Sequence, residues 1–162
     1  MAEQKRAPAA ALQLTGARFL IVEARYYEEI GAMLFEGARA AIEAAGASAE
    51  TLAVPGALEI PAGIAIALDA AGAAGRPFDG AVALGCVIRG ATFHFEIVAG
   101  ESARALMDLS VARRLPLGNG ILTVDTLAQA EQRADPRQGD KGGDAARAVL
   151  SLAALKRSLG AS

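Results

Sequence analysis

Hydrophobic residues gather in four short runs along the chain, with longer and more polar stretches between them. The runs cover residues 18–24, 50–54, 80–87 and 116–124. The first and third runs are almost continuously apolar, which is typical of parallel strands that are buried on both faces. We therefore predict four β-strands at these positions.

The stretches that follow these runs carry apolar residues at every third or fourth position, which predicts helices. After the first run, this spacing extends from residue 30 to residue 45, and Gly46 is a candidate for the helix C-cap. Pro61 suits the first turn of a second helix that reaches about residue 71. The helix expected after the third run has one apolar face, formed by Phe95, Val98, Ser102, Ala105, Leu106 and Leu109.

Two further helices are expected after the fourth run. Thr126 and Gln129 have the spacing of a capping box, which predicts a short helix to about residue 134. Residues 135–143 are rich in turn-forming residues and predict a loop. The last helix turns four apolar residues toward the core, namely Ala146, Val149, Leu150 and Ala153.

Strands that alternate with helices predict right-handed βαβ units and a parallel sheet covered on both faces. The chain has 162 residues, which fits a single core, and its sequence contains no repeat or linker. We expect residues 1–15 to form an N-terminal arm and residues 16–162 to form one domain. Ligands of such folds bind at the carboxyl ends of the strands, so this edge is the place to look for a site.

Composition narrows the classes of function. Aromatic residues make up 4% of the chain and the net charge is -2, which argues against a nucleic-acid surface. Charged residues or glycines interrupt every apolar run, so we expect no membrane-spanning segment. The single cysteine excludes an internal disulfide and fits a reducing, cytoplasmic environment.

The stretch over residues 84–96 (LGCVIRGATFHFE) is the strongest candidate for chemistry. It predicts a strand, a tight turn and a helix N-terminus, where backbone N–H groups without helical partners can bind an anion. His94, the only histidine, falls in the first turn of this helix. Histidine is the residue type that most often transfers protons in enzymes, so His94 is a candidate for proton transfer beside a bound phosphate, although single histidines are more often packing or surface residues.

Other residues near the strand ends have a functional and a structural interpretation. Tyr26 follows the first strand and could stack on a flat ring, or be a half-buried loop tyrosine. Glu59 could accept hydrogen bonds from a polyol, or stabilise a helix N-terminus. Thr92 could cap the helix and also donate to a phosphate. Arg89 has the position of a structural ion-pair partner.

Two basic residues and the cysteine have weaker support from the residues alone. Arg133 and Lys141 flank the 135–140 loop and could be either solvated surface residues or phosphate ligands. Cys86 lies on a strand that we expect to be buried, where a thiol is inert, so a Cys86–His94 nucleophilic pair is disfavoured. One Cys and one His cannot supply a zinc site, and the chain contains neither a P-loop nor a dinucleotide-binding glycine motif after a strand.

Four motifs, in order and at matching spacing, resemble the lumazine synthase family of riboflavin biosynthesis. They are residues 54–61 (VPGALEIP), 84–96, 120–123 (GILT) and 140–142 (DKG), and the resemblance extends over about residues 16–159. It implies a three-layer α/β/α sandwich with a four-stranded parallel sheet, flavodoxin-like. It also implies a transferase that needs no cofactor or metal.

The resemblance implies a reaction between two small molecules, 5-amino-6-(D-ribitylamino)uracil and 3,4-dihydroxy-2-butanone 4-phosphate. The product would be 6,7-dimethyl-8-ribityllumazine, with phosphate and water released. Imine formation, phosphate elimination and ring closure would follow one another, and positioning would supply much of the catalysis.

The resemblance also implies roles for individual residues. His94 would transfer protons. The phosphate would be bound by Gly90, Ala91, Thr92 and Arg133, with Lys141 contacting the substrate or steering its phosphate. The ring and its ribityl chain would contact Tyr26, Ala57, Leu58, Glu59, Cys86, Val87 and Ile88, the last three through their backbones.

The resemblance also implies an oligomeric assembly, and two positions of this chain differ from the pattern of the family. The family places its sites between subunits of a homopentamer, with a larger icosahedral shell as the alternative and riboflavin synthase as a potential partner. Asn119 stands where many members have a phenylalanine from the adjacent subunit, and Leu58 stands where a phenylalanine is frequent. The 135–140 loop lacks the glycine-rich, lysine-containing version associated with shells, which leaves pentamer and shell open.

Two rival functions share this scaffold. A non-catalytic flavin or lumazine binder would keep the pocket, but the presence of both His94 and Arg133 disfavours it. A phosphorylation-dependent signalling module would need an aspartate at the end of the third strand, where this chain has Cys86.

Overall fold

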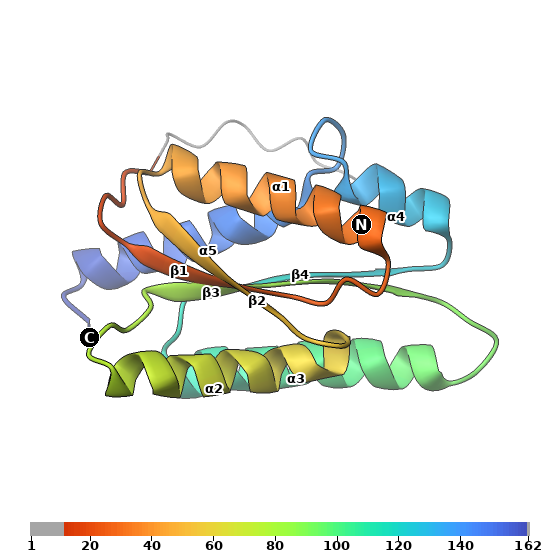
Figure 1. The fold of residues 1–162 in the computed structure, drawn as a ribbon, viewed down its shortest axis with the longest axis horizontal. Coiled ribbons are helices and arrows are strands. Elements are labelled where there is room, and N and C mark those ends of the chain that lie inside the picture. The colour runs from red at the N-terminus through yellow and green to blue at the C-terminus, as the bar shows by residue number, and fades with distance from the viewer. Residues whose placement is uncertain (1–11, 162) are drawn as a thin grey trace.

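A four-stranded sheet lies between two layers of helices in the computed structural model, which describes residues 12–161 (Figure 1). The elements are, in chain order, β1 (Arg18–Glu23), α1 (Glu28–Ala44), β2 (Ser48–Ala53), the 3₁₀ turn η1 (Ala57–Glu59), α2 (Ile60–Ala73), β3 (Gly80–Ile88), α3 (His94–Arg113), β4 (Leu117–Val124), α4 (Leu127–Ala134) and α5 (Lys141–Ser158). All four predicted strands and all five predicted helices are present, and the strand boundaries lie within two residues of those expected. Helix α5 begins at Lys141, three residues inside the loop predicted over residues 135–143.

The strands are all parallel, in the order β2-β1-β3-β4. Helices α1, α4 and α5 cover one face of the sheet, and α2 and α3 cover the other (Figure 1). This confirms the predicted α/β architecture.

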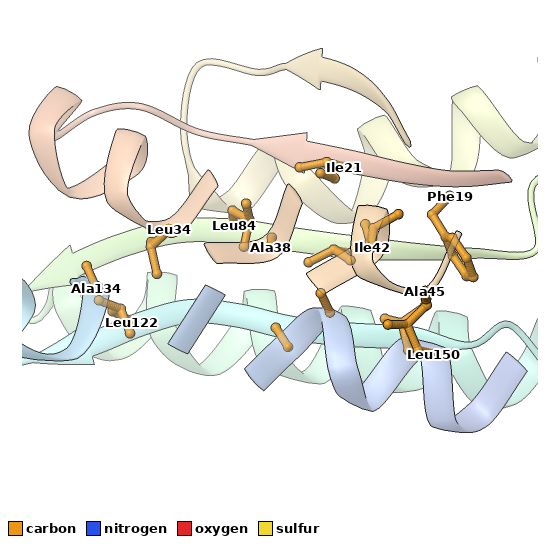
Figure 2. Close-up of a cluster of buried hydrophobic side chains, with 14 of the residues drawn as sticks. Phe19, Ile21, Leu34, Ala38, Ile42, Ala45, Leu84, Leu122, Ala134 and Leu150 are labelled. Carbon is orange, nitrogen blue, oxygen red and sulfur yellow. The ribbon is translucent and has the colours of Figure 1, made fainter. Parts of the chain in front are cut away.

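The alternation of side chains along β1 explains why its sequence is continuously apolar. Phe19 and Ile21 point to the layer of α1 and α5, whereas Leu20 and Val22 point to the layer of α2 and α3, and all four are buried. Figure 2 shows the first of these two clusters, where Leu34 of α1 packs with residues from β1, β3 and β4. Strand β2 lies at the edge and is mostly exposed.

The chain segment before β1 packs against the end of α1. Leu14 is only 2% exposed, and its backbone N–H donates to the carbonyl oxygen of Ala45 at 2.8 Å. Most of the expected N-terminal arm, residues 1–11, lies outside the described residues, so the division of the chain at residue 15 stays a prediction. Within residues 12–161, no helix is both long enough and apolar enough to cross a membrane.

Glycines allow α5 to approach both α1 and the sheet closely. A Cβ atom on Gly142 would overlap the carbonyl oxygen of Leu34 in α1, and one on Gly118 would overlap the carbonyl oxygen of Ala145 in α5. Gly46 has the left-handed φ of +70° expected of the residue that ends α1. The α5 layer therefore depends on residues without side chains where the backbones meet.

We expect Gly142→Ala to lower the free energy of unfolding by about 1–3 kcal/mol, because the backbone of α1 must move to admit the methyl group. The matched control is Gly72→Ala in α2, where no atom lies within 4 Å of the added Cβ. This variant should keep the wild-type stability or gain about 0.4–1 kcal/mol. Urea unfolding of both variants measures the difference, and equal stability would contradict the close α1–α5 crossing.

Candidate active site

The carboxyl ends of the four strands deliver their connections to one edge of the sheet, on the right in Figure 1. The first strand leads to Tyr26 and the second to η1, which contacts both β3 and α3. The third leads to the turn at residues 89–93, and the fourth to Asp125. The order of the strands thus brings together the residues predicted from the first three ends.

The turn before α3 keeps the features of an anion site. Phe93 is the N-cap of α3, and its side chain makes no capping hydrogen bond. The N–H groups of the first helical turn have no partner within the helix, and the helix dipole favours a negative charge there. His94 is the first residue of α3 and is exposed, as are Gly90, Ala91 and Thr92.

The prediction that Thr92 caps α3 is wrong. The helix begins one residue later than that role requires, and the cap position falls on Phe93 in an αR conformation. The hydroxyl of Thr92 is therefore not used as a cap. At α4 the predicted cap is confirmed, because Thr126 Oγ1 accepts from the N–H of Gln129 at 3.2 Å.

Arg89 forms an ion-pair cluster beside this turn, in line with its expected structural role. Its Nε donates to Asp125 Oδ1 at 2.8 Å and its Nη1 donates to Glu96 Oε1. The guanidinium also lies 4.1 Å above the ring centroid of Phe95. The hydrogen bond that Arg89 donates to Glu96 holds the pKa of the Glu96 carboxyl below its ordinary value.

The sequence analysis did not identify Glu96 and Asp125 as partners of Arg89. A usable signal was present, because Asp125 and Arg89 follow directly after neighbouring parallel strands, at the same edge of the sheet.

Residues expected to meet the ring of a substrate lie along the same edge. Tyr26 is 77% exposed, not half-buried, and its ring lies edge-on to Tyr27 with centroids 5.1 Å apart. Glu59 and Leu58 are exposed at the end of β2, and Ala57 is partly buried. Tyr27, which the sequence analysis did not single out, lines a hollow of about 200 Å³ with residues of α1 and α4.

The end of β3 has one edge without a neighbouring strand. Strand β1 pairs with β3 only as far as Leu84, whereas β4 pairs with it as far as Ile88. In the part of the chain that the structure describes, the backbone of residues 86–88 therefore has no strand partner on the β1 side. Backbone N–H and C=O groups at this edge are available to a ligand.

Cys86 is half-buried, not fully buried as expected, and it is the first of three partly exposed residues at the end of β3. Burial still raises the pKa of its thiol to about 11. Tyr27 lies near it, and burial, with smaller contributions from Cys86 and Tyr26, raises the pKa of the Tyr27 phenol.

Three predicted residues are not brought to the turn by this chain. Arg133 Nη1 donates to the carbonyl oxygen of Gln129, and Lys141 Nζ pairs with Asp144 at 3.1 Å, each within its own helix. Asn119 is the third residue of β4, opposite Ala83, and lies near the start of the strand. Asn119 lines a hollow of about 330 Å³ between α3 and β4 with Ala99, Gly100, Ser102, Ala103, Ile121 and Thr123.

The loop between Arg133 and Lys141 is held in a fixed shape by Asp135. The carboxylate of Asp135 accepts from the backbone N–H of Arg137 at 2.9 Å and from Gln138 Nε2 at 3.0 Å. The side-chain hydrogen bond from the Arg137 guanidinium contributes most to holding the pKa of Asp135 well below its usual range. The two basic residues are thus presented by an ordered segment.

No group of three or more His, Cys, Asp or Glu side chains in residues 12–161 is placed to hold a metal ion. The candidate site consists of the turn before the N-terminus of α3, one exposed imidazole and an open strand edge. It defines an α/β protein with a small-molecule site at the carboxyl ends of parallel strands.

Comparison with known proteins identifies the particular family. Residues 16–157 match the 6,7-dimethyl-8-ribityllumazine synthase family. A protein of Methylocella silvestris named 6,7-dimethyl-8-ribityllumazine synthase is 72% identical over 146 residues, which are 90% of this chain and 89% of that protein. A protein of Rhodopseudomonas palustris named 6,7-dimethyl-8-ribityllumazine synthase 1 is 61% identical over 160 residues, 98% of each chain.

The chain belongs to the 6,7-dimethyl-8-ribityllumazine synthase family and is an enzyme, a transferase of riboflavin biosynthesis. The predictions of family, enzyme class and α/β fold are thereby confirmed. Membership also supports small-molecule substrates and oligomeric assembly in general terms. The roles of individual residues stay predictions.

We expect the Cys86 thiol to react slowly with iodoacetamide at pH 8, because a pKa of about 11 leaves little thiolate. The rate should rise with pH up to about pH 11. Cys86 is the only cysteine, so mass spectrometry reports it directly, with Cys86→Ser as the blank and a short cysteine peptide as the unburied reference. A rate that levels off by pH 9 would show an activated thiol instead.

Proposed function

We propose that this chain condenses 5-amino-6-(D-ribitylamino)uracil with 3,4-dihydroxy-2-butanone 4-phosphate to form 6,7-dimethyl-8-ribityllumazine, phosphate and water. The observation that carries the proposal is the turn at residues 90–93, which leads into the N-terminus of α3 directly beside His94, without a side-chain cap on the helix. A phosphate held at this helix end places the rest of a short phosphorylated substrate within reach of the imidazole.

His94 is the proposed proton-transfer group. Imine formation converts an amine and a carbonyl into a C=N bond and water, and it needs a proton on the departing oxygen. Elimination removes a proton from carbon as the C–O bond to phosphate breaks. An exposed imidazole at the first position of α3 can serve both steps, since its ring nitrogens can both accept and donate a proton.

The pyrimidine substrate is proposed to lie along the open edge of β3. Its donor and acceptor groups would pair with the backbone of Cys86, Val87 and Ile88, and the exposed ring of Tyr26 would stack on it. Ala57 and Leu58 would line the pocket, and the Glu59 carboxylate would accept from the ribityl hydroxyl groups.

The site is proposed to be completed by a neighbouring subunit that supplies Arg133, Lys141 and Asn119. Within one chain, Arg133 and Lys141 contact only their own helices among the bonds described above, and Asn119 lies away from the carboxyl edge. A second copy could bring these side chains to the turn without a change in either fold.

Exposed side chains on α3 support oligomerisation. Phe93, Ile97, Met107 and Val111 are large, apolar and exposed, and their spacing places them along one side of the helix. We propose a homopentamer, with an icosahedral shell as the alternative and riboflavin synthase as a partner. The N-terminal arm would cover the exposed edge at β2 of a neighbour. A cytoplasmic location, without any cofactor, completes the proposal.

His94→Ala should lower kcat by about 10²–10⁴-fold while the product still binds, because only proton transfer is lost. The assay follows the lumazine chromophore after the two substrates are mixed, with the uncatalysed reaction subtracted. Product binding is measured separately by fluorescence. Unchanged turnover in this variant would remove His94 from the mechanism.

Arg133→Ala should raise the KM of the phosphorylated substrate, because its phosphate loses a charged partner. The shared site gives a sharper test, because His94→Ala and Arg133→Ala subunits damage different halves of each site. Unfolding and refolding the two variants together should restore part of the activity, since some sites then receive both intact halves. No recovery from mixed assemblies, or a monomer in light scattering, would contradict the shared site.

A further inference from the structure

The Arg89 side chain joins both ends of the proposed phosphate-binding turn to the neighbouring strand. Arg89 itself enters the turn, whereas its partners Phe95 and Glu96 lie in the helix that leaves it. Its third partner, Asp125, follows β4. The backbone of Arg89 is also fixed, because its N–H donates to the carbonyl oxygen of Val124 at 2.9 Å.

We call Arg89 with its partners Glu96 and Asp125 the Arg89 clamp. Residues 90–93 depend on this clamp, because few other contacts hold them. All four are exposed, and the cap residue Phe93 contributes no side-chain hydrogen bond to α3. A Cβ atom on Gly90 would meet nothing within 4 Å, so packing does not fix the turn there. The direction of the first-turn N–H groups therefore follows from the position of Arg89 and the residues it binds.

The clamp also reaches the helix that carries Arg133. Asp125 directly precedes Thr126, the cap of α4, and its backbone N–H donates to Gln129 Oε1 at 2.8 Å. Holding Asp125 therefore fixes the start of α4 relative to the turn.

The small contribution of exposed ion pairs to the free energy of folding indicates that Arg89 acts by positioning its neighbours more than by stabilising the fold. Arg89 is about half exposed, and exposed ion pairs contribute only about 0–1 kcal/mol to folding. A planar guanidinium can nevertheless bind two carboxylates and stack on a ring at the same time, which a lysine ammonium cannot reproduce.

We propose that Arg89 is a positioning residue for phosphate binding, which holds the turn and the start of α4 in fixed relation by bridging Glu96 and Asp125. This inference rests on the proposed function of the turn. Arg89 is not a catalytic residue, because both of its hydrogen-bonding arms are occupied by carboxylates.

The first test compares Arg89→Gln with Arg113→Gln. Arg113 is a matched control, because it ends the same helix and pairs with Asp69 at 2.5 Å, far from the turn. We expect Arg89→Gln to raise the KM of the phosphorylated substrate by roughly tenfold or more, with the KM of the pyrimidine and the thermal midpoint close to those of the control. Arg89→Lys should restore only part of the loss. Identical kinetics for the Arg89→Gln and Arg113→Gln variants would overturn the proposal.

A second test distinguishes the positioning role of Arg89 from the effect of losing its positive charge. Removing Arg89 alone leaves two uncompensated carboxylates near the phosphate, so a triple variant with Arg89→Gln, Glu96→Gln and Asp125→Asn removes all three charges. The KM should stay high in this variant if the clamp acts through geometry. Recovery of the wild-type KM would show that charge neutralisation alone was needed, and would overturn the positioning role.

Inorganic phosphate distinguishes failure of this inference from failure of the proposed function. Calorimetry measures its binding to the full chain without any turnover. If the wild type makes no product, weaker phosphate binding by Arg89→Gln than by Arg113→Gln still supports the inference, whereas equal or absent binding overturns it. If Arg89→Gln does not fold, Asp125→Asn cuts one arm of the clamp and should weaken phosphate binding in the same direction.

Discussion

Burial of β1 and β3 on both faces is the constraint on which the rest of the structure depends. Side chains of both strands alternate between two apolar layers, so helices must cover each face, and each connection must cross from one end of the sheet to the other. The polar connections between strands and helices therefore lie at the two ends of the strands. The carboxyl edge is where helix N-termini and strand ends meet, and it is the edge that carries His94 and its neighbours.

The same constraint explains which elements could be predicted from the sequence. Strands β1 and β3 were evident because every position faces a core, which leaves an almost unbroken apolar run. Strand β2 begins two residues earlier than expected, because an exposed edge strand has no apolar pattern to mark its ends. The start of α5 was hidden by Gly142 and Gly143, which are typical loop residues. In the structure Gly142 admits the backbone of α1, and Gly143 leaves room for the carboxylate of the cap residue Asp140.

The parts of the candidate site that are contiguous in the sequence could be predicted. The contacts between residues of separate elements could not. The turn and His94 form one contiguous motif, so their proximity needed no tertiary information. The partners of Arg89 lie on separate elements, and only strand pairing brings Asp125 beside it. Cys86 likewise lies beyond Leu84, where the pairing of β1 with β3 ends, and periodicity does not indicate that its side chain is partly exposed.

The open edge at the end of β3 has a consequence for how the site can change over time. The flat ring that we propose to pair with main-chain groups of residues 86–88 would take the place that another strand would occupy. Recognition of this kind does not depend on which side chains these residues carry, because every amino acid except proline offers the same amide donor and acceptor. Substitutions at Cys86 and Val87 can therefore alter the shape and polarity of the walls while the register of the ring is retained. At such an edge the main chain sets the orientation of the ring, and the side chains set how well the pocket fits it.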